Sequence, residues 1–211
     1  CAQGAGMNTP ICDFVREYSR KNPLRLHMPG HKGESFLGCE KYDITEIPGA
    51  DSLYEADGII AESEENASRL FGCKTYYSTE GSSQCIRAML CLAMLHAKAQ
   101  GKRMKVAAAK NAHKVFLSGA AMLDLDVTWL YPDEGETYLS CNLSAGTVER
   151  FLKEQGGEIT ALYLTSPDYL GNVANIREIS EVCRRYRVLL LVDNAHGAYL
   201  KFLPDSLHPI D

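Results

Sequence analysis

The sequence predicts an α/β fold in which helices cover both faces of a mainly parallel sheet, giving three layers. Two observations favour this fold: helical patterns alternate with short apolar runs from Ile59 onward, and the last run, 188–192, is apolar throughout. The composition agrees with it. Of the 211 residues, 45% are apolar and 23% are charged, which is ordinary for a globular protein with one sizeable core.

The beginning of the chain predicts one helix followed by an irregular arm. Residues 1–6 are expected to be a remnant or an upstream extension that takes no part in the fold. Thr9 and Pro10 form an N-cap and first-turn pair, and apolar residues at helical spacing follow, so we expect a helix over 10–21. Residues 24–57 show little periodicity and carry four glycines, which indicates a loop-rich arm within an N-terminal segment, 7–57.

The larger segment, residues 58–211, alternates helices and strands. Helices are expected over 60–71 (ending before Gly72), 82–99, 112–122, 145–154 (beginning at Ser144) and 176–186. Strands are expected over 74–78, 104–109, 126–131, 159–165 and 188–192, the last of them fully buried. Because ligands bind at the carboxyl ends of strands in open α/β sheets, the residues just after each strand are the candidates for a site.

Several classes of function are disfavoured. The net charge of −5 is spread along the chain, so we expect no nucleic-acid partner. No apolar run approaches the roughly 18 residues that span a bilayer, and no signal peptide is evident, so a cytoplasmic protein is expected. The eight cysteines form no CxxC pair and are expected to be reduced thiols, without a metal site.

Residues 78–84 follow the first expected strand and open a long helix. Gly81 would let the backbone approach a ligand, the first helical N–H groups are free, and Ser82 and Ser83 add hydroxyls, which together indicate a phosphate site. The segment does not match the dinucleotide fingerprint, the Walker loop or the GxSxG nucleophile elbow. A plain glycine turn with Ser82 as N-cap remains the alternative.

Three further candidates follow other strands. His113 could stack on a flat ring, although a lone histidine is more often structural or solvent-exposed. Asp193 directly follows the apolar run, where its charge needs a cation or several donors; a protonated pyridine nitrogen is one such cation, and an N-cap role is the alternative. A metal held by Asp193 and His196 would lack an evident third ligand. Residues 165–171 would form a wall of the same cleft, or a simple turn.

Five motifs in order resemble the Orn/Lys/Arg decarboxylases, a family of pyridoxal-phosphate (PLP) enzymes with the aspartate-aminotransferase-like fold. They are HMPGHKG (27–33), DITEIPGADSLYEADG (43–58), NAHK (111–114), SPDYLG (166–171) and DNAHGAY (193–199). The resemblance extends from Met7 to nearly the end of the chain. It implies that residues 58–211 are the front portion of a PLP-binding large domain, which would be incomplete here.

The resemblance also implies roles for individual residues. The cofactor PLP would be contacted by Gly81, Ser82, Ser83, His113, Ser166, Asp193 and Ala195. The first three would hold the phosphate, His113 would stack on the pyridine ring, and Asp193 would pair with the ring nitrogen. Ala195 would pack beneath the ring with His196 close to it, and the implied catalytic residues are His113, Asp193 and His196.

Two departures from the family bear on activity. The family's cofactor-binding lysine lies in a Ser-x-His-Lys motif that these residues do not include, and the context of Lys32 does not fit that role, so we expect the isolated chain to be inactive. Glu80 stands where the family more often has asparagine, which puts a negative charge near the phosphate site.

The resemblance implies decarboxylation of a basic amino acid, arginine, lysine or ornithine, to its amine and CO2. It also implies a homodimer or higher homo-oligomer, in which the HMPGHKG arm lies near the active site at a dimer interface. Another PLP enzyme of the same fold, such as an aminotransferase, and a non-catalytic relative that keeps the fold remain as alternatives.

Overall fold

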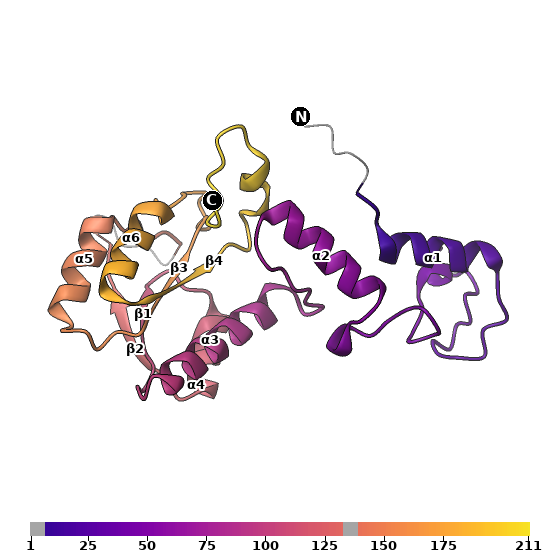
Figure 1. Ribbon diagram of the computed structural model, residues 1–211, viewed down its shortest axis with the longest axis horizontal. Coiled ribbons are helices and arrows are strands. Elements are labelled where there is room, and N and C mark those ends of the chain that lie inside the picture. Colours follow the sequence, from indigo (N-terminus) through magenta and orange to yellow (C-terminus); the bar gives the residue numbers. More distant parts are fainter. Residues whose placement is uncertain (1–6, 133–138) are drawn as a thin grey trace. The chain divides into compact units, whose positions relative to one another are not determined.

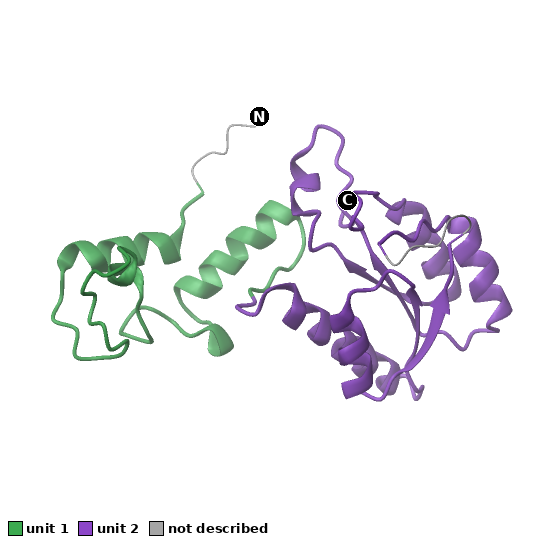
Figure 2. Ribbon diagram, turned by 180° about the vertical axis from the view of Figure 1, so that it is seen from behind, with its two compact units in different colours: residues 1–77 green, residues 78–211 purple. Residues whose placement is uncertain are grey.

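The chain forms two compact units, one ending at Tyr77 and the other spanning Ser78–Asp211 (Figure 2). The computed structural model describes residues 7–132 and 139–211, so the expectation for residues 1–6 lies outside the described residues. The functional division expected at residue 57 stays a prediction.

The larger unit is built on a parallel sheet of four strands in the order β2-β1-β3-β4. The strands are β1 (Lys105–Ala109), β2 (Asp126–Leu130), β3 (Ala161–Thr165) and β4 (Leu189–Asp193). Parallel neighbours require crossover connections, and helices supply them here. All four carboxyl ends therefore lie at one edge of the sheet.

Helices cover both faces of the sheet (Figure 1). They are α3 (Gly81–Ala99) and α4 (Lys114–Met122) on one face, and α5 (Ala145–Glu154) and α6 (Ile176–Tyr186) on the other. Alternate strand residues supply the two cores: Val106 and Ala108 pack with α3 and α4, whereas Ala107 and Ala109 pack on the α5 and α6 side. The predicted three-layer α/β/α fold is confirmed.

Capping residues explain where these helices begin. Ser144 accepts a hydrogen bond from the N–H of Thr147 at 3.1 Å, so α5 begins where predicted. His113 caps α4 through its ring, and that helix begins at Lys114 rather than at the predicted residue 112. Glu80 stands at the N-cap position of α3, so the alternative that made Ser82 an N-cap is wrong.

Two strand predictions are corrected. Residues 74–78 form no strand, because no neighbouring strand pairs with them. Tyr77 is held by side chains of a helix instead: its N–H donates to Glu64 and its hydroxyl to the carbonyl of Ser63. The run at 188–192 was expected to be fully buried, but β4 is an edge strand of the sheet, and Leu190 and Val192 are only half-buried.

Over its described residues, 7–77, the smaller unit contains two helices and two short 3₁₀ turns. They are α1 (Pro10–Lys21), η1 (Glu40–Tyr42), η2 (Leu53–Glu55) and α2 (Ile59–Phe71). The predicted bounds of α1 are confirmed, and α2 begins one residue before its prediction. Gly72 ends α2 with φ 74°, the left-handed conformation that favours glycine. A further 3₁₀ turn, η3 (Ala198–Phe202), belongs to the larger unit.

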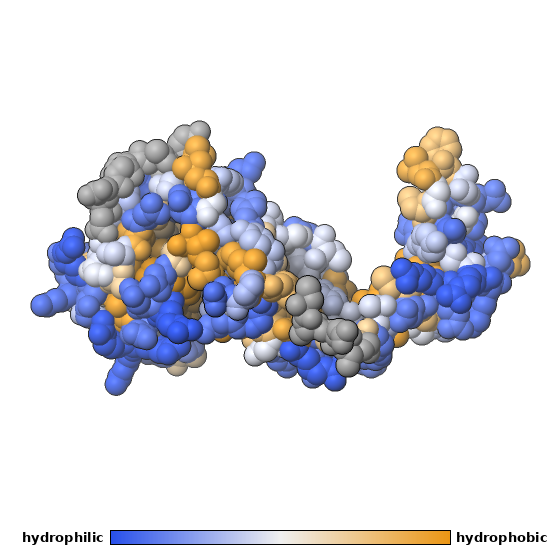
Figure 3. All heavy atoms as spheres, turned by 90° about the horizontal axis from the view of Figure 1, so that it is seen from above, coloured by the Kyte–Doolittle hydropathy of each residue, from blue (hydrophilic) through white to orange (hydrophobic). Residues whose placement is uncertain are grey.

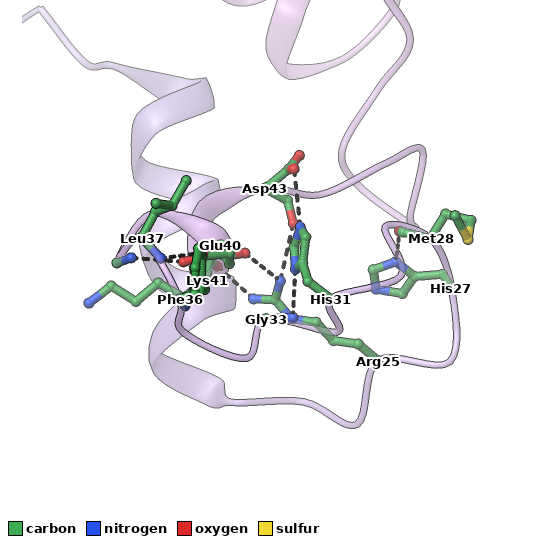
Figure 4. A network of polar contacts seen from close by, with 11 residues as sticks. Arg25, His27, Met28, His31, Gly33, Phe36, Leu37, Glu40, Lys41 and Asp43 are labelled. Carbon is green, nitrogen blue, oxygen red and sulfur yellow. Dashed lines mark hydrogen bonds and ion pairs between the residues drawn. The ribbon is translucent and has the colours of Figure 1, made fainter.

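The arm of the smaller unit is organised by charged side chains rather than by a hydrophobic core (Figure 4). Arg25, only 7% exposed, donates to the carbonyl oxygens of Glu40, Lys41 and Asp43 at 3.3, 2.6 and 3.1 Å. The carboxylate of Glu40 accepts three backbone N–H groups from residues 36–38, and these bonds lower its pKa to about 2.

Asp51 organises the segment before α2. With φ 67°, it accepts hydrogen bonds from the N–H groups of four residues: Ser52, Asp57, Gly58 and Ile60. Burial alone would raise the pKa of Asp51, but these donors outweigh burial and hold the pKa well below its usual range. Asp51 thus gives the 43–58 motif a structural role, because its carboxylate caps the helix that follows the motif.

Large apolar side chains are exposed in the smaller unit (Figure 3). The most exposed of them, at 66–92%, are Leu24, Leu26, Met28, Phe36, Leu37, Tyr54 and Tyr76. Of its described residues only four are buried, and three of those are polar: Arg25, Glu40 and Asn66, beside Pro10.

Candidate functional site

A cavity of about 240 Å³ lies in the larger unit, beside residues that follow β1, β3 and β4. It is lined by Ser82, Ile86, His113, Thr165, Tyr169, Asp193, Ala195 and His196. Five of these are residues that the sequence had singled out, and they come from three separate segments of the chain. Two more, Thr165 and Tyr169, come from the segment expected to form a wall.

Asp193 is the buried charge of this cavity, with 6% of its surface exposed. One carboxylate oxygen, Oδ2, accepts a hydrogen bond from the Tyr163 hydroxyl at 2.9 Å, and the other, Oδ1, accepts one from the N–H of Ala195 at 3.2 Å. A buried carboxylate requires such donors, because moving its charge from water into the protein without them costs free energy. The arrangement holds a negative charge in the cavity, where a cation could meet it.

His113 is fixed by its own helix. Its Nδ1 accepts the N–H of Val115 at 3.2 Å, so Nδ1 presents a lone pair and the proton of the neutral ring lies on Nε2. Capping thus orients a flat ring that also lines the cavity. The structural and the functional roles of His113 are compatible.

The N-terminus of α3 provides Gly81, Ser82 and Ser83, of which Ser82 lines the cavity. Gly81 has φ 64°, and a Cβ built there would meet no atom within 4 Å, so the space beside it is open. The Glu80 side chain makes no capping bond to the helix; its carboxylate lies 3.4 Å from Arg87 instead. The first N–H groups of α3 therefore keep their ability to bind an anion.

Ser166 is not among the residues that line the cavity. It is 1% exposed, and its Oγ accepts the N–H of Ala174 at 3.1 Å. Its carbonyl oxygen accepts Asn194 Nδ2 at 2.6 Å, and its N–H donates to the carbonyl of Asp193. Ser166 therefore ties the end of β3 to the loop that carries Asp193.

Ala195 and His196 are exposed beyond the end of β4, at the mouth of the cavity. The imidazole of His196 lies 5.9 Å from the ring of Tyr169, measured between centroids. The two loops that follow β3 and β4 thus meet through aromatic side chains. Lys32 belongs to the smaller unit, where its Nζ donates to the carbonyl oxygen of His27 at 2.6 Å.

Sequence reasoning missed two residues of this region, Ile86 in the cavity wall and Tyr163 behind Asp193. The signal for Tyr163 was a phenol between two leucines of a strand, because a buried hydroxyl requires a partner. Within residues 7–132 and 139–211, no three His, Cys, Asp or Glu side chains gather as a metal site. In the same residues, no helix has the length and apolar character to cross a bilayer.

The comparisons with known proteins agree on one family. A family model described as Orn/Lys/Arg decarboxylase, major domain, matches residues 9–208. An arginine decarboxylase of Halalkalibacterium halodurans is 29% identical over 206 residues, covering 92% of this chain and 40% of the relative. This chain therefore spans less than half the length of that relative.

Solved structures share the fold. The constitutive lysine decarboxylase of E. coli gives a TM-score of 0.74 at 20% identity, covering 93% of this chain and 30% of that one. Oryza sativa TDC with PLP and tryptamine gives a TM-score of 0.55 at 15% identity, covering 70% and 34%. With a family model for the major domain matching nearly all of its residues, this chain belongs to the Orn/Lys/Arg decarboxylase family.

Proposed function

We propose that this chain is the front, cofactor-binding portion of a PLP-dependent decarboxylase that converts arginine, lysine or ornithine to the amine and CO2. The observation that carries the proposal is the single cavity that brings together His113, Asp193 and the N-terminus of α3. A flat ring, a buried carboxylate and free helical N–H groups are complementary to the three parts of PLP: its aromatic face, its ring nitrogen and its phosphate.

The N–H groups of Gly81, Ser82 and Ser83 would hold the phosphate, with the Ser82 hydroxyl as a further donor. The open space beside Gly81 supports this, because an anion needs room to approach the backbone. Glu80 is the feature that opposes an anion here. Arg87 lies beside Glu80 and offsets part of that charge. The offset is only partial because both side chains are partly exposed, so solvent screens the pair.

Asp193 would face the pyridine nitrogen and hold a proton on it, and His113 would lie against the ring. When bound, PLP supplies an electron sink for the charge left after the carboxylate departs, and a protonated ring nitrogen strengthens that sink. Ala195 would leave room beneath the ring, and His196 would lie close enough to exchange a proton with a ligand. Ser166 would act on the cofactor through the loop that it anchors.

A second copy of the chain is the proposed partner of the smaller unit. Exposed Leu24, Leu26, Phe36 and Leu37 support this proposal, because a unit whose buried residues are mostly polar needs another surface to cover such side chains. Sedimentation of the wild type beside Phe36→Ser tests it: loss of a dimer in the variant supports the proposal, and a monomeric wild type opposes it.

The proposed function is tested first by titration with PLP. We expect wild-type protein to bind PLP and Asp193→Asn to bind it more weakly, while Asp205→Asn, an exposed aspartate outside the cavity, matches wild type. Equal binding by all three proteins would argue against the site.

Turnover is tested on a version that continues through the family's Ser-x-His-Lys motif, since these 211 residues contain none. We expect CO2 release from one of the three basic amino acids by that version and none by the 211-residue chain. A keto acid product would favour the aminotransferase alternative. A protein that binds PLP but releases neither product would favour the non-catalytic alternative.

A further inference from the structure

Tyr163 makes a direct contact with the buried carboxylate of the cavity. Its hydroxyl donates to Asp193 Oδ2 at 2.9 Å, and its surface is fully buried. The cavity is lined by Asp193 but not by Tyr163, so the phenol supports the carboxylate from the protein side. It is one of two donors to that carboxylate, the other being the N–H of Ala195.

The register of the sheet sets this contact. Tyr163 pairs with Leu191, and Thr165 pairs with Asp193. Because residues two apart along a strand share a face, Tyr163 and Asp193 lie on the same face, which α3 and α4 cover. A phenol is long enough to reach the diagonal neighbour on the next strand.

The ring of Tyr163 is held in place by α4. Its centroid lies 4.4 Å from that of Phe116, which in turn packs edge-on to Trp129 at 6.0 Å. Phe116 is in the first turn of α4, the helix that His113 caps. One packed group of side chains therefore connects the support of Asp193 to the helix that orients His113.

The hydroxyl keeps its proton. Burial raises the pKa of Tyr163, and the nearby charge of Asp193 and the hydrogen bond to it raise the pKa further. Tyr163 thus remains a hydrogen-bond donor across the range in which an enzyme works.

We infer that Tyr163 is a positioning residue that holds the Asp193 carboxylate oriented toward the ring nitrogen of the bound cofactor. The inference rests on the proposed function, because it concerns how Asp193 serves PLP. Without the hydroxyl, a buried carboxylate loses one of its two donors. The carboxylate would then turn away from the ring nitrogen, which would lose its counter-charge.

The test uses pyridoxine 5′-phosphate labelled with ¹⁵N in the ring, a probe without the aldehyde that reacts with lysines. Its nitrogen chemical shift is followed against pH in complex with the protein. We expect Tyr163→Phe to lower the pH at which the bound nitrogen loses its proton by about one unit, a tenfold change in proton affinity. Tyr186→Phe makes the same chemical change in the core on the opposite face and should leave the midpoint unchanged.

Asp193→Asn separates the inference from the proposed function. If Asp193→Asn leaves the nitrogen midpoint at the wild-type value, the proposed role of Asp193 is wrong and the inference falls with it. If Asp193→Asn lowers the midpoint but Tyr163→Phe does not, only the inference is overturned. We expect the double variant to match Asp193→Asn, because the hydroxyl acts through the carboxylate.

A second measurement covers the case in which Tyr163→Phe does not fold. The ζ-carbon signal of Tyr163 is followed against pH in the wild type and in Asp193→Asn, both of which keep the phenol. We expect Tyr163 to ionise at a lower pH in Asp193→Asn, since the carboxylate charge is gone. The same ionisation in both proteins would show that the two groups are not coupled and would overturn the inference.

Discussion

Gly197→Ala should destabilise the larger unit and loosen the loop that carries Asp193. A Cβ at this position would lie 2.2 Å from Asn194 Nδ2 and 2.5 Å from Pro167 Cδ, whereas heavy atoms in contact prefer about 3.5–4.0 Å. Neither neighbour moves easily, because the Asn194 amide is bonded to Ser166 at 2.6 Å and a proline ring is rigid. Gly197 has φ −119°, so the requirement for glycine is one of space.

The magnitude follows from two contributions. Overpacking of a buried site costs about 1–3 kcal/mol. Loss of the Asn194 hydrogen bond adds about 0.5–1.5 kcal/mol. We therefore expect Gly197→Ala to lower the free energy of unfolding by about 1.5–4.5 kcal/mol. It should also weaken PLP binding, because Asp193 and His196 lie just before Gly197 in the same segment.

The assay is urea unfolding followed by the fluorescence of Trp129, the single tryptophan, which lies in β2 of the larger unit. Gly146→Ala is the matched control: it lies in α5, and its new Cβ would meet only Ser144 Oγ at 3.7 Å. Alanine should stabilise that helix by about 0.5–1 kcal/mol. Wild-type stability in Gly197→Ala, or equal effects of the two variants, would refute the steric reasoning.

Three further predictions concern other parts of the chain. Arg25→Lys should speed amide exchange over residues 36–43 and cost about 2 kcal/mol or more, because Nη1 and Nη2 bond three carbonyl groups from two positions that one ammonium nitrogen cannot occupy; unchanged exchange would contradict it. Burial pushes the pKa of Asp168 up, but bonds from Asn172 hold it below its ordinary 3.8. Its stabilisation is therefore present above that value and lost as pH falls through the folded-state pKa, so the stability gap between wild type and Asp168→Asn should close in acid unfolding curves. Burial raises the pKa of Cys183 to about 11, so mass spectrometry should find it unlabelled by iodoacetamide at pH 8 while exposed cysteines react.

Local signals in the sequence were sufficient for much of the fold. The amphipathic pattern over 176–186 and the cap at Ser144 predicted the limits of their helices, because both depend on neighbouring residues only. The strand expected at 74–78 failed for the opposite reason. A strand requires a partner, and whether one is available depends on segments distant in the sequence.

At the candidate site, too, local signals were sufficient for some residues, while contacts between distant segments could not be predicted. The rule that ligands bind at carboxyl ends of parallel strands placed His113, Asp193 and His196 at one edge of the sheet, and all three line one cavity. Ser166 was expected at the cofactor, but its side chain bonds to backbone. The contact between Tyr163 and Asp193 depends on the register between two strands, which no local pattern reveals.

That register connects the stability of the fold to the proposed chemistry. Along β3, Leu162 and Leu164 enter one core, while Tyr163 enters the other. A slip of one residue would move the phenol to the wrong face and bury leucine against the carboxylate, so the two cores select against it. The environment of Asp193 is therefore fixed by the same packing that holds the sheet together. Substitutions in either core should change cofactor binding only when they disturb this pairing.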